Sequence, residues 1–263
     1  DLLPKSLKSD LSELVDLSPM EPVKVQGSSD TTQKILWKLR DGQFIESVLI
    51  RATEGTKGVR ASRLTLCVST QVGCALGCKF CASGLDGLKR NLSTGEIVGQ
   101  ILLAKRAAGR RIDNLVFMGM GEPLLNVEPV MASISLMQHQ NAYGLSKRRI
   151  TLSTSGIVPE INKLADKTDV SLAISLHAAN NILRDQIVPI NKKYPLEELL
   201  GACKNYLKTQ SKRKTITIEY ILIDGVNDSL DHAKDLAKVL NGLSCKINLI
   251  PFNPFDGCNY SRS

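Results

Sequence analysis

Three cysteines of this sequence stand at a spacing that can hold a metal cluster. Cys74, Cys78 and Cys81 form the pattern CxxxCxxC. Three thiolates at this spacing can bind one face of a cubane iron–sulfur cluster, and Gly73 and Gly77 permit tight turns around them. Three protein ligands leave one iron open to a chelating substrate, as catalytic metal sites keep an open position. The cysteines therefore predict an iron–sulfur centre with an open coordination site.

Two other interpretations of these cysteines stay open. Structural zinc needs four ligands, usually as two pairs, and the sequence has no second CxxC and no HxxxH. Cys67 could supply a fourth sulfur, but it lies seven residues before Cys74, on a predicted strand. Inert buried thiols are the remaining possibility. The total of 7 cysteines is odd, which fits a reducing compartment better than a disulfide scaffold.

The cysteines follow the first of six short apolar or β-branched runs that alternate with helical patterns. The runs are 64–68, 114–118, 149–153, 170–176, 215–221 and 246–250, and the helical patterns are 94–108, 127–140, 157–167, 182–187, 196–209 and 230–240. This alternation predicts an α/β fold with a parallel sheet and right-handed crossovers. We expect a partial (β/α)6 barrel, with a doubly wound sheet as the alternative, and a site at the carboxyl ends of the strands.

The chain before residue 64 has a different pattern. Residues 1–33 are expected to form a short helix, at 7–17, and then a mobile linker. Asp41-Gly42 lies between two β-rich runs and predicts a hairpin over residues 34–63. Residues 64–263 are then the α/β core, and Ser93 with Glu96 forms a capping box that opens its first helix.

Composition excludes several classes of protein. With 263 residues, 43% hydrophobic, the chain is neither disordered nor collagen-like, and its apolar runs are too short to cross a bilayer. The net charge of +8 favours a polyanionic partner. Basic clusters occur at Lys89-Arg90, Lys147-Arg148-Arg149, Lys192-Lys193 and Lys212-Arg213-Lys214. If several of them share one rim, they would follow a phosphate backbone.

Six segments, in order, resemble the RlmN/Cfr family of radical S-adenosylmethionine (SAM) RNA adenine methyltransferases, and the RlmN branch in particular. They are residues 66–81, 118–126, 147–156, 174–178, 187–194 and 248–254, within a match over about residues 35–263. The resemblance implies a radical SAM barrel that holds one [4Fe–4S] cluster through Cys74, Cys78 and Cys81, with SAM as the second cofactor.

The resemblance also implies a SAM site at the ends of the strands. The matching positions are Gly121, Glu122, Ser153, Ser175, Leu176, His177 and Asn253. The Glu122 carboxylate and neighbouring carbonyls suit the α-ammonium group of SAM, and Asn253 matches a contact to adenosine. A glycine-rich strand end by itself would more often be a turn.

Two further residues match catalytic positions of the family, in which a methylated cysteine near the C-terminus delivers its methyl group to C2 of an adenine. Cys67 matches the cysteine that releases the methylated base, and Glu46 matches the proton acceptor. By spacing alone, Glu46 is only an outward residue of a strand. The family's methyl-carrying cysteine lies beyond the last matched motif, and Cys258 comes too early to replace it. We therefore expect this chain to bind cluster and SAM without completing methylation.

Alternative functions stay open. They are a Cfr-like enzyme that methylates C8, a truncated non-catalytic homologue that binds SAM or RNA, and a zinc-stabilised binding module. The resemblance implies rRNA as substrate, with tRNA as a further one, and the target adenine must leave its stack to react. It also implies a flavodoxin- or ferredoxin-type electron donor, a monomer without membrane association, and a cytoplasmic location, with an organelle as the alternative.

Overall fold

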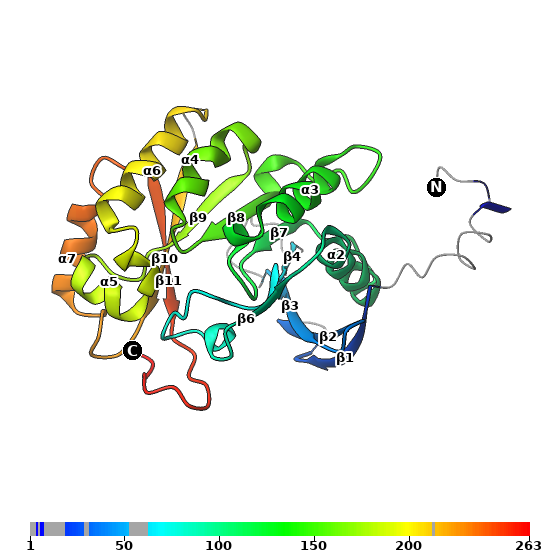
Figure 1. Ribbon diagram of the computed structural model, residues 1–263, viewed down its shortest axis with the longest axis horizontal. Coiled ribbons are helices and arrows are strands. Elements are labelled where there is room, and N and C mark those ends of the chain that lie inside the picture. Colours follow the sequence, from blue (N-terminus) through cyan, green and yellow to red (C-terminus); the bar gives the residue numbers. More distant parts are fainter. Residues whose placement is uncertain (1–3, 5, 8–18, 29–31, 53–62, 212–213) are drawn as a thin grey trace.

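The computed structural model describes residues 4, 6–7, 19–28, 32–52, 63–211 and 214–263. A nine-stranded sheet forms its centre, in the order β1-β2-β3-β4-β7-β8-β9-β10-β11 (Figure 1). The strands are β1 (Met20–Gln26), β2 (Gln33–Leu39), β3 (Phe44–Arg51), β4 (Leu64–Cys67), β7 (Asn114–Phe117), β8 (Ile150–Thr154), β9 (Ser171–Ser175), β10 (Ile216–Leu222) and β11 (Cys245–Pro251). Each of the six runs predicted to be strands forms one, within one residue at either end.

The six strands from β4 to β11 in this sheet pair in parallel and follow one another in chain order. A doubly wound sheet would reverse the strand order at a switch point. The order observed here does not reverse, so the prediction of a (β/α)6 arrangement is confirmed over the doubly wound alternative. All six strands end at the same edge of the sheet.

Helices follow the parallel strands, and Figure 1 shows them arranged around the sheet. They are α2 (Thr94–Ala108), α3 (Val127–Gln138), α4 (Val158–Lys167), α5 (Asn181–Ile187), α6 (Leu196–Lys208) and α7 (Leu230–Val239). Short 3-10 turns are η1 (Ala82–Gly84), η2 (Pro123–Leu125), η3 (Lys147–Arg149) and η4 (Pro189–Lys192). Leu115, Leu152 and Leu172 of the central strands are almost fully buried, which places the main core within the sheet and its helices. In the described part of the chain, no helix is long and apolar enough to cross a membrane.

The N-terminal extension differs in part from expectation. The hairpin is confirmed as β2 and β3, which pair antiparallel around Asp41-Gly42. The expectation of a linker up to residue 33 is wrong for residues 20–26, which form β1 and pair with β2. Met20 is buried at the start of β1, and Gly99 of α2 leaves the space in which Pro19 and Met20 pack. The helix expected at 7–17 lies almost entirely outside the described residues.

A second, two-stranded sheet was not predicted. It pairs β5 (Gln71–Gly73) with β6 (Leu88–Asn91) antiparallel. The three clustered cysteines lie in the loop between these strands. The small sheet therefore fixes both ends of the cysteine loop next to the carboxyl end of β4.

Candidate active site

One cavity of about 250 Å³ opens at the carboxyl ends of the parallel strands. The residues singled out in the sequence that line it are Cys74, Cys78, Cys81, Gly121, Glu122, Ser153, Ser175 and His177. They come from the cysteine loop and from the ends of β7, β8 and β9. The tertiary structure thus brings together eight of the twelve candidate residues.

The three thiols face the cavity from a tightly folded loop. Gly73 has φ +76°, and a side chain there would meet the carbonyl oxygen of Gly87 at 2.0 Å, so only glycine closes this loop. Burial, with smaller effects from the neighbouring charges of Cys81 and Cys74, raises the pKa of the Cys78 thiol to about 12. Three buried thiolates close together need cations to neutralise their charge. The irons of an iron–sulfur cluster would supply these cations, so the three cysteines suit such a cluster. No three His, Cys, Asp or Glu side chains in the described ranges form a site for a single metal ion.

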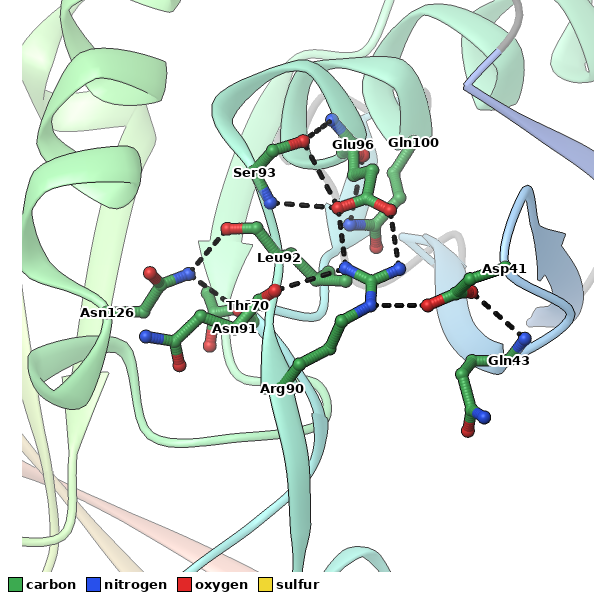
Figure 2. Close-up of polar contacts among 10 residues, drawn as sticks. All are labelled: Asp41, Gln43, Thr70, Arg90, Asn91, Leu92, Ser93, Glu96, Gln100 and Asn126. Carbon is green, nitrogen blue, oxygen red and sulfur yellow. Dashed lines mark hydrogen bonds and ion pairs between the residues drawn. The ribbon is translucent and has the colours of Figure 1, made fainter.

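Buried polar side chains hold the base of this loop (Figure 2). The Asn126 amide donates to the carbonyl oxygens of Thr70 and Leu92, each over 2.8 Å, and so ties together the two chain segments that enter and leave the loop. Arg90 of β6 binds Asp41 of the hairpin turn and Glu96 of α2. These contacts join the cysteine loop to the hairpin and to the first core helix.

The predicted capping box is present at the start of α2. Ser93 Oγ accepts from the N–H of Glu96, and a Glu96 carboxylate oxygen accepts from the N–H of Ser93. Because Glu96 also binds Arg90, the cap connects the helix N-terminus to β6.

Glu122 is a buried carboxylate at the cavity wall. Its two oxygens accept from the backbone N–H groups of Leu124 (3.0 Å) and Ser155 (2.8 Å), and it is 2% exposed. Burial raises the pKa of Glu122 to about 7, although these two N–H groups favour the charged form. No Lys, Arg or His of the described residues forms an ion pair with it. A cationic ligand in the cavity would supply the missing counter-charge.

His177 adopts φ +60°, the one positive value among non-glycine residues in the described part of the chain. Its Nδ1 accepts from the N–H of Ile221 over 3.0 Å, and its ring lies edge-on to Phe80, with centroids 4.6 Å apart. Burial lowers the pKa of His177 to about 3, with a smaller effect from the Arg184 charge. The ring is therefore neutral and, since Nδ1 accepts, carries its proton on Nε2, where it can donate to a ligand.

Glu46 and Cys67 lie together but outside the lining of this cavity. Val48 of β3 pairs directly with Cys67 of β4, so Glu46, two residues before Val48, shares the face of Cys67. The Glu46 carboxylate forms an ion pair with Lys34 over 2.9 Å. Burial raises the pKa of the Cys67 thiol to about 12.

Two further candidates, Leu176 and Asn253, lie outside the lining of this cavity. Leu176 is fully buried, and Asn253 is exposed after the end of β11; neither lines the cavity. The cavity instead includes Glu219 of β10, whose pKa is raised by burial and which accepts from the Asn248 amide over 2.6 Å. Its place inside a strand gave no signal in the sequence.

Two of the four basic clusters lie away from this cavity. Lys147-Arg148-Arg149 precede β8 and Lys214 precedes β10, so both lie at the amino ends of the strands, opposite the cavity. Lys147 pairs with Asp169, and Arg90 is held by Asp41 and Glu96. Lys212 and Arg213 lie outside the described residues. The clusters at 147–149 and at Lys214 therefore do not contribute to a phosphate-binding rim at this cavity.

Comparison with known proteins places this site in a family context. Residues 68–237 match the model of the radical SAM superfamily. The chain is 49% identical over 264 residues to the dual-specificity RNA methyltransferase RlmN of Marinobacter nauticus, covering 98% of this chain and 69% of that protein. The RlmN of Saccharophagus degradans is 50% identical over 266 residues, covering 98% of this chain and 65% of that protein. A crystal structure of a radical SAM methyltransferase from Sphaerobacter thermophilus superposes with a TM-score of 0.89 at 45% identity, over 99% of this chain and 75% of that one.

Proposed function

Because the chain belongs to the radical SAM superfamily and, within it, to the RlmN family of RNA methyltransferases, we propose that it methylates C2 of adenine in rRNA and tRNA. The observation that carries the proposal is the single cavity in which three thiols meet Glu122, Ser153, Ser175 and His177. The chain spans about two thirds of the length of its curated relatives, so the activity of a whole relative is part of the proposal.

The family uses a [4Fe–4S] cluster and SAM, and the cavity fits both. Cys74, Cys78 and Cys81 would hold the cluster through three irons, since they line one wall from a single loop. When bound, the cluster supplies an electron to the sulfonium of SAM. This chain's part is to hold the thiolates, exclude water and orient SAM against the open iron.

The part of the cavity formed by the ends of β7, β8 and β9 is suited to the amino-acid end of SAM. The Glu122 carboxylate, held by two N–H groups and without a protein cation, would accept the α-ammonium group. Ser153 and Ser175 line the same cavity from β8 and β9. His177, neutral with Nε2 protonated, would donate to a ligand oxygen or nitrogen rather than act as a base.

Glu46 and Cys67 are proposed to act on the product side of the reaction. Because both project from one face of the β3–β4 pair, a base held near one would be within reach of the other. Cys67 would attack the sulfur of the protein–base link, so that a disulfide forms as the carbon–sulfur bond breaks and the methylated base leaves. Glu46 would take the proton from C2 of the adenine. The high pKa of the Cys67 thiol means that a base must remove its proton before it attacks.

We also propose the partners that this chemistry needs. An electron donor of the flavodoxin or ferredoxin type would reduce the cluster, and the protein would act as a monomer in the cytoplasm. The net charge of +8 supports association with RNA.

A methylation assay with product analysis tests the proposal. The anaerobically reconstituted protein is incubated with SAM, a reductant and rRNA or tRNA, and the nucleosides are separated and identified by mass spectrometry. The assay is run on a chain that includes the family's methyl-carrying cysteine, and 2-methyladenosine, absent with Cys74→Ala, is the expected product. 8-Methyladenosine would instead indicate the Cfr-like activity. If that chain is loaded and binds SAM but modifies neither position, the proposal is overturned in favour of a non-catalytic homologue. A colourless, iron-free protein would favour a zinc-stabilised module.

A further inference from the structure

Arg184 of α5 is a fully buried cation to which the proposed function assigns no role. Its guanidinium donates to the carbonyl oxygens of Ser155 (2.7 Å), Ser175 (3.1 Å) and Leu176 (3.0 Å). It also donates to the side-chain oxygen of Asn191 over 2.9 Å. These acceptors lie where β8 and β9 end, so one side chain joins the two strand ends that line the cavity beside the cysteine loop.

The charge of Arg184 has no carboxylate partner in the described part of the chain. All four of its acceptors are neutral oxygens, and the adjacent Asp185 accepts from the Asn191 amide instead. Burying an uncompensated cation is costly, and an uncharged or apolar side chain of similar size would often serve stability better. A merely structural brace between strand ends therefore does not account for the charge.

Negative charge does reach Arg184 through Ser155. The carbonyl oxygen of Ser155 accepts from Arg184, and its N–H donates to Glu122 over 2.8 Å. The Ser155 side chain also acts to lower the pKa of Cys78, against the larger effect of burial. Burial lowers the pKa of Arg184 to about 10, and the negative charge of a Cys78 thiolate, the largest opposing effect, raises it. Ser155 therefore contacts the Arg184 cation on one side and the Glu122 carboxylate on the other.

We propose that Arg184 is a positioning residue that fixes the ends of β8 and β9 for SAM and, through its buried charge, makes the cluster held by Cys78 easier to reduce. Reduction adds one negative charge to the cluster, and a nearby cation in a low-dielectric interior stabilises that charge. The inference rests on the cluster and SAM parts of the proposed function, and it is independent of which RNA is modified.

Three variants separate the two effects. Arg184→Gln removes the charge and most donors, while Arg184→Lys keeps the charge but cannot reach four acceptors with one nitrogen. Arg149→Gln is the matched control, since Arg149 stands at the amino end of β8 and donates to Asn114 over 3.0 Å. Each protein is reconstituted anaerobically, and its iron content, its cluster midpoint potential and the Kd of SAM are measured.

We expect a more negative midpoint potential for Arg184→Gln than for the wild type, and a potential near that of the wild type for Arg184→Lys. The Kd of SAM should rise about tenfold in both, because hydrogen bonds from a charged group are lost at the strand ends. Arg149→Gln should leave both quantities unchanged.

Each half of the inference can be overturned separately. An unchanged potential in Arg184→Gln, or an equal shift in Arg149→Gln, refutes the electrostatic role. An unchanged Kd of SAM in Arg184→Lys refutes the positioning role. If Arg184→Gln does not fold, Arg184→Lys alone tests both roles. In that case, a midpoint potential of Arg184→Lys that is clearly more negative than that of the wild type refutes the electrostatic role. A wild-type protein that takes up no iron would overturn the proposed function as well, whereas a loaded wild type with unaltered variants overturns this inference alone.

Discussion

The side chain of Gln71 accepts a hydrogen bond from the backbone N–H of Glu122, with 2.8 Å between Oε1 and N. Gln71 is fully buried in β5, immediately before the cysteine loop, and its Nε2 donates to Asn91 of β6. One amide therefore links both strands that bound the cysteine loop to Glu122, which lines the same cavity as the three cysteines. These hydrogen bonds fix the position of the Glu122 backbone relative to the two strands that carry the cysteine loop.

Gly121 makes this link possible, and Gly121→Ala should break it. Gly121 has φ +96°, and an added Cβ would lie 2.5 Å from Cβ and 2.9 Å from the backbone N of Gln71. We expect a loss of at least about 2 kcal/mol in the free energy of unfolding, from backbone strain and collision together. Urea unfolding measures it. Gly109→Ala, at φ +63° with open space around it, should cost only about 1 kcal/mol, and equal losses at the two sites would contradict the role of the collision.

Glu122→Gln should weaken SAM binding. The neutral amide lacks the charge that attracts an ammonium group, so the Kd of SAM should rise about tenfold to a hundredfold. Because the pKa of Glu122 is raised to about 7, binding to the wild type should strengthen as the pH rises through about 7, and the variant should lack this step. Equilibrium dialysis over a pH series measures both. Glu128→Gln, at an exposed pair with Lys167, is the control, and a parallel pH response in both variants would contradict the assignment.

The three loop cysteines should each be needed for iron, and Cys67 should not. Cys74→Ala, Cys78→Ala and Cys81→Ala are expected to lose most iron and sulfide after anaerobic reconstitution, because a three-thiolate site has no spare ligand. Cys67→Ala should retain both, and Cys245→Ser, at the start of β11, is the structural control. Loss of metal from Cys67→Ala would point to a four-sulfur site and would count against the open iron.

Asn126→Asp should destabilise the base of the cysteine loop. The substitution keeps the shape but replaces the amide that donates to Thr70 and Leu92 with oxygens that repel both carbonyls. The carbonyl oxygen of Leu92 loses the donor that Asn126 supplies, and that of Thr70 keeps only the backbone N–H of Leu92, which predicts a loss of about 2 kcal/mol or more in the free energy of unfolding. Thermal or urea unfolding measures it. Asn205→Asp, on the exposed side of α6, should change the value by less than about 0.5 kcal/mol, and a similar loss there would argue against a specific role for Asn126.

His177 should make the apoprotein less stable in acid. Its pKa is lowered from 6.5 to about 3, so the unfolded chain binds a proton that the folded chain excludes. The stability it contributes is present above about pH 6.5 and is lost as the pH falls toward 3, at about 1.4 kcal/mol per unit.

The test compares unfolding free energies of the wild type and His177→Asn at two pH values. Asparagine tolerates the positive φ of this position. Between pH 6.5 and 5, the free energy of unfolding of the wild type should fall by about 2 kcal/mol more than that of the variant. Glu122 contributes in the opposite direction in both proteins, so its contribution cancels in the comparison. The exposed His139→Asn should behave as the wild type. Equal slopes for the wild type and His177→Asn would rule out a buried neutral histidine.

Much of the fold and part of the site could be predicted because they depend on neighbours in the sequence. The spacing of Cys74, Cys78 and Cys81 lies within one loop, and the strand–helix alternation forces a parallel sheet whose strands end at one edge. That edge is enough to bring Glu122 and Ser153 to one cavity. The strand β1 escaped prediction because Val23 and Val25 are about half exposed, so its apolar residues do not mark a buried face. Its pairing with β2 defines it instead.

By itself, the sequence determined the six parallel strands, and it predicted three cysteines as cluster ligands at the edge where those strands end, since each follows from spacing over a few residues. Only the tertiary structure decided that Gln71, Ser155 and Arg184 connect these parts, and that the basic clusters are divided between opposite ends of the sheet. In the sequence, Arg184 is one more charge on a short helix. It becomes a buried cation because carbonyl oxygens from two distant strands meet its guanidinium, a coincidence that depends on how the helix packs and not on its neighbours in the chain.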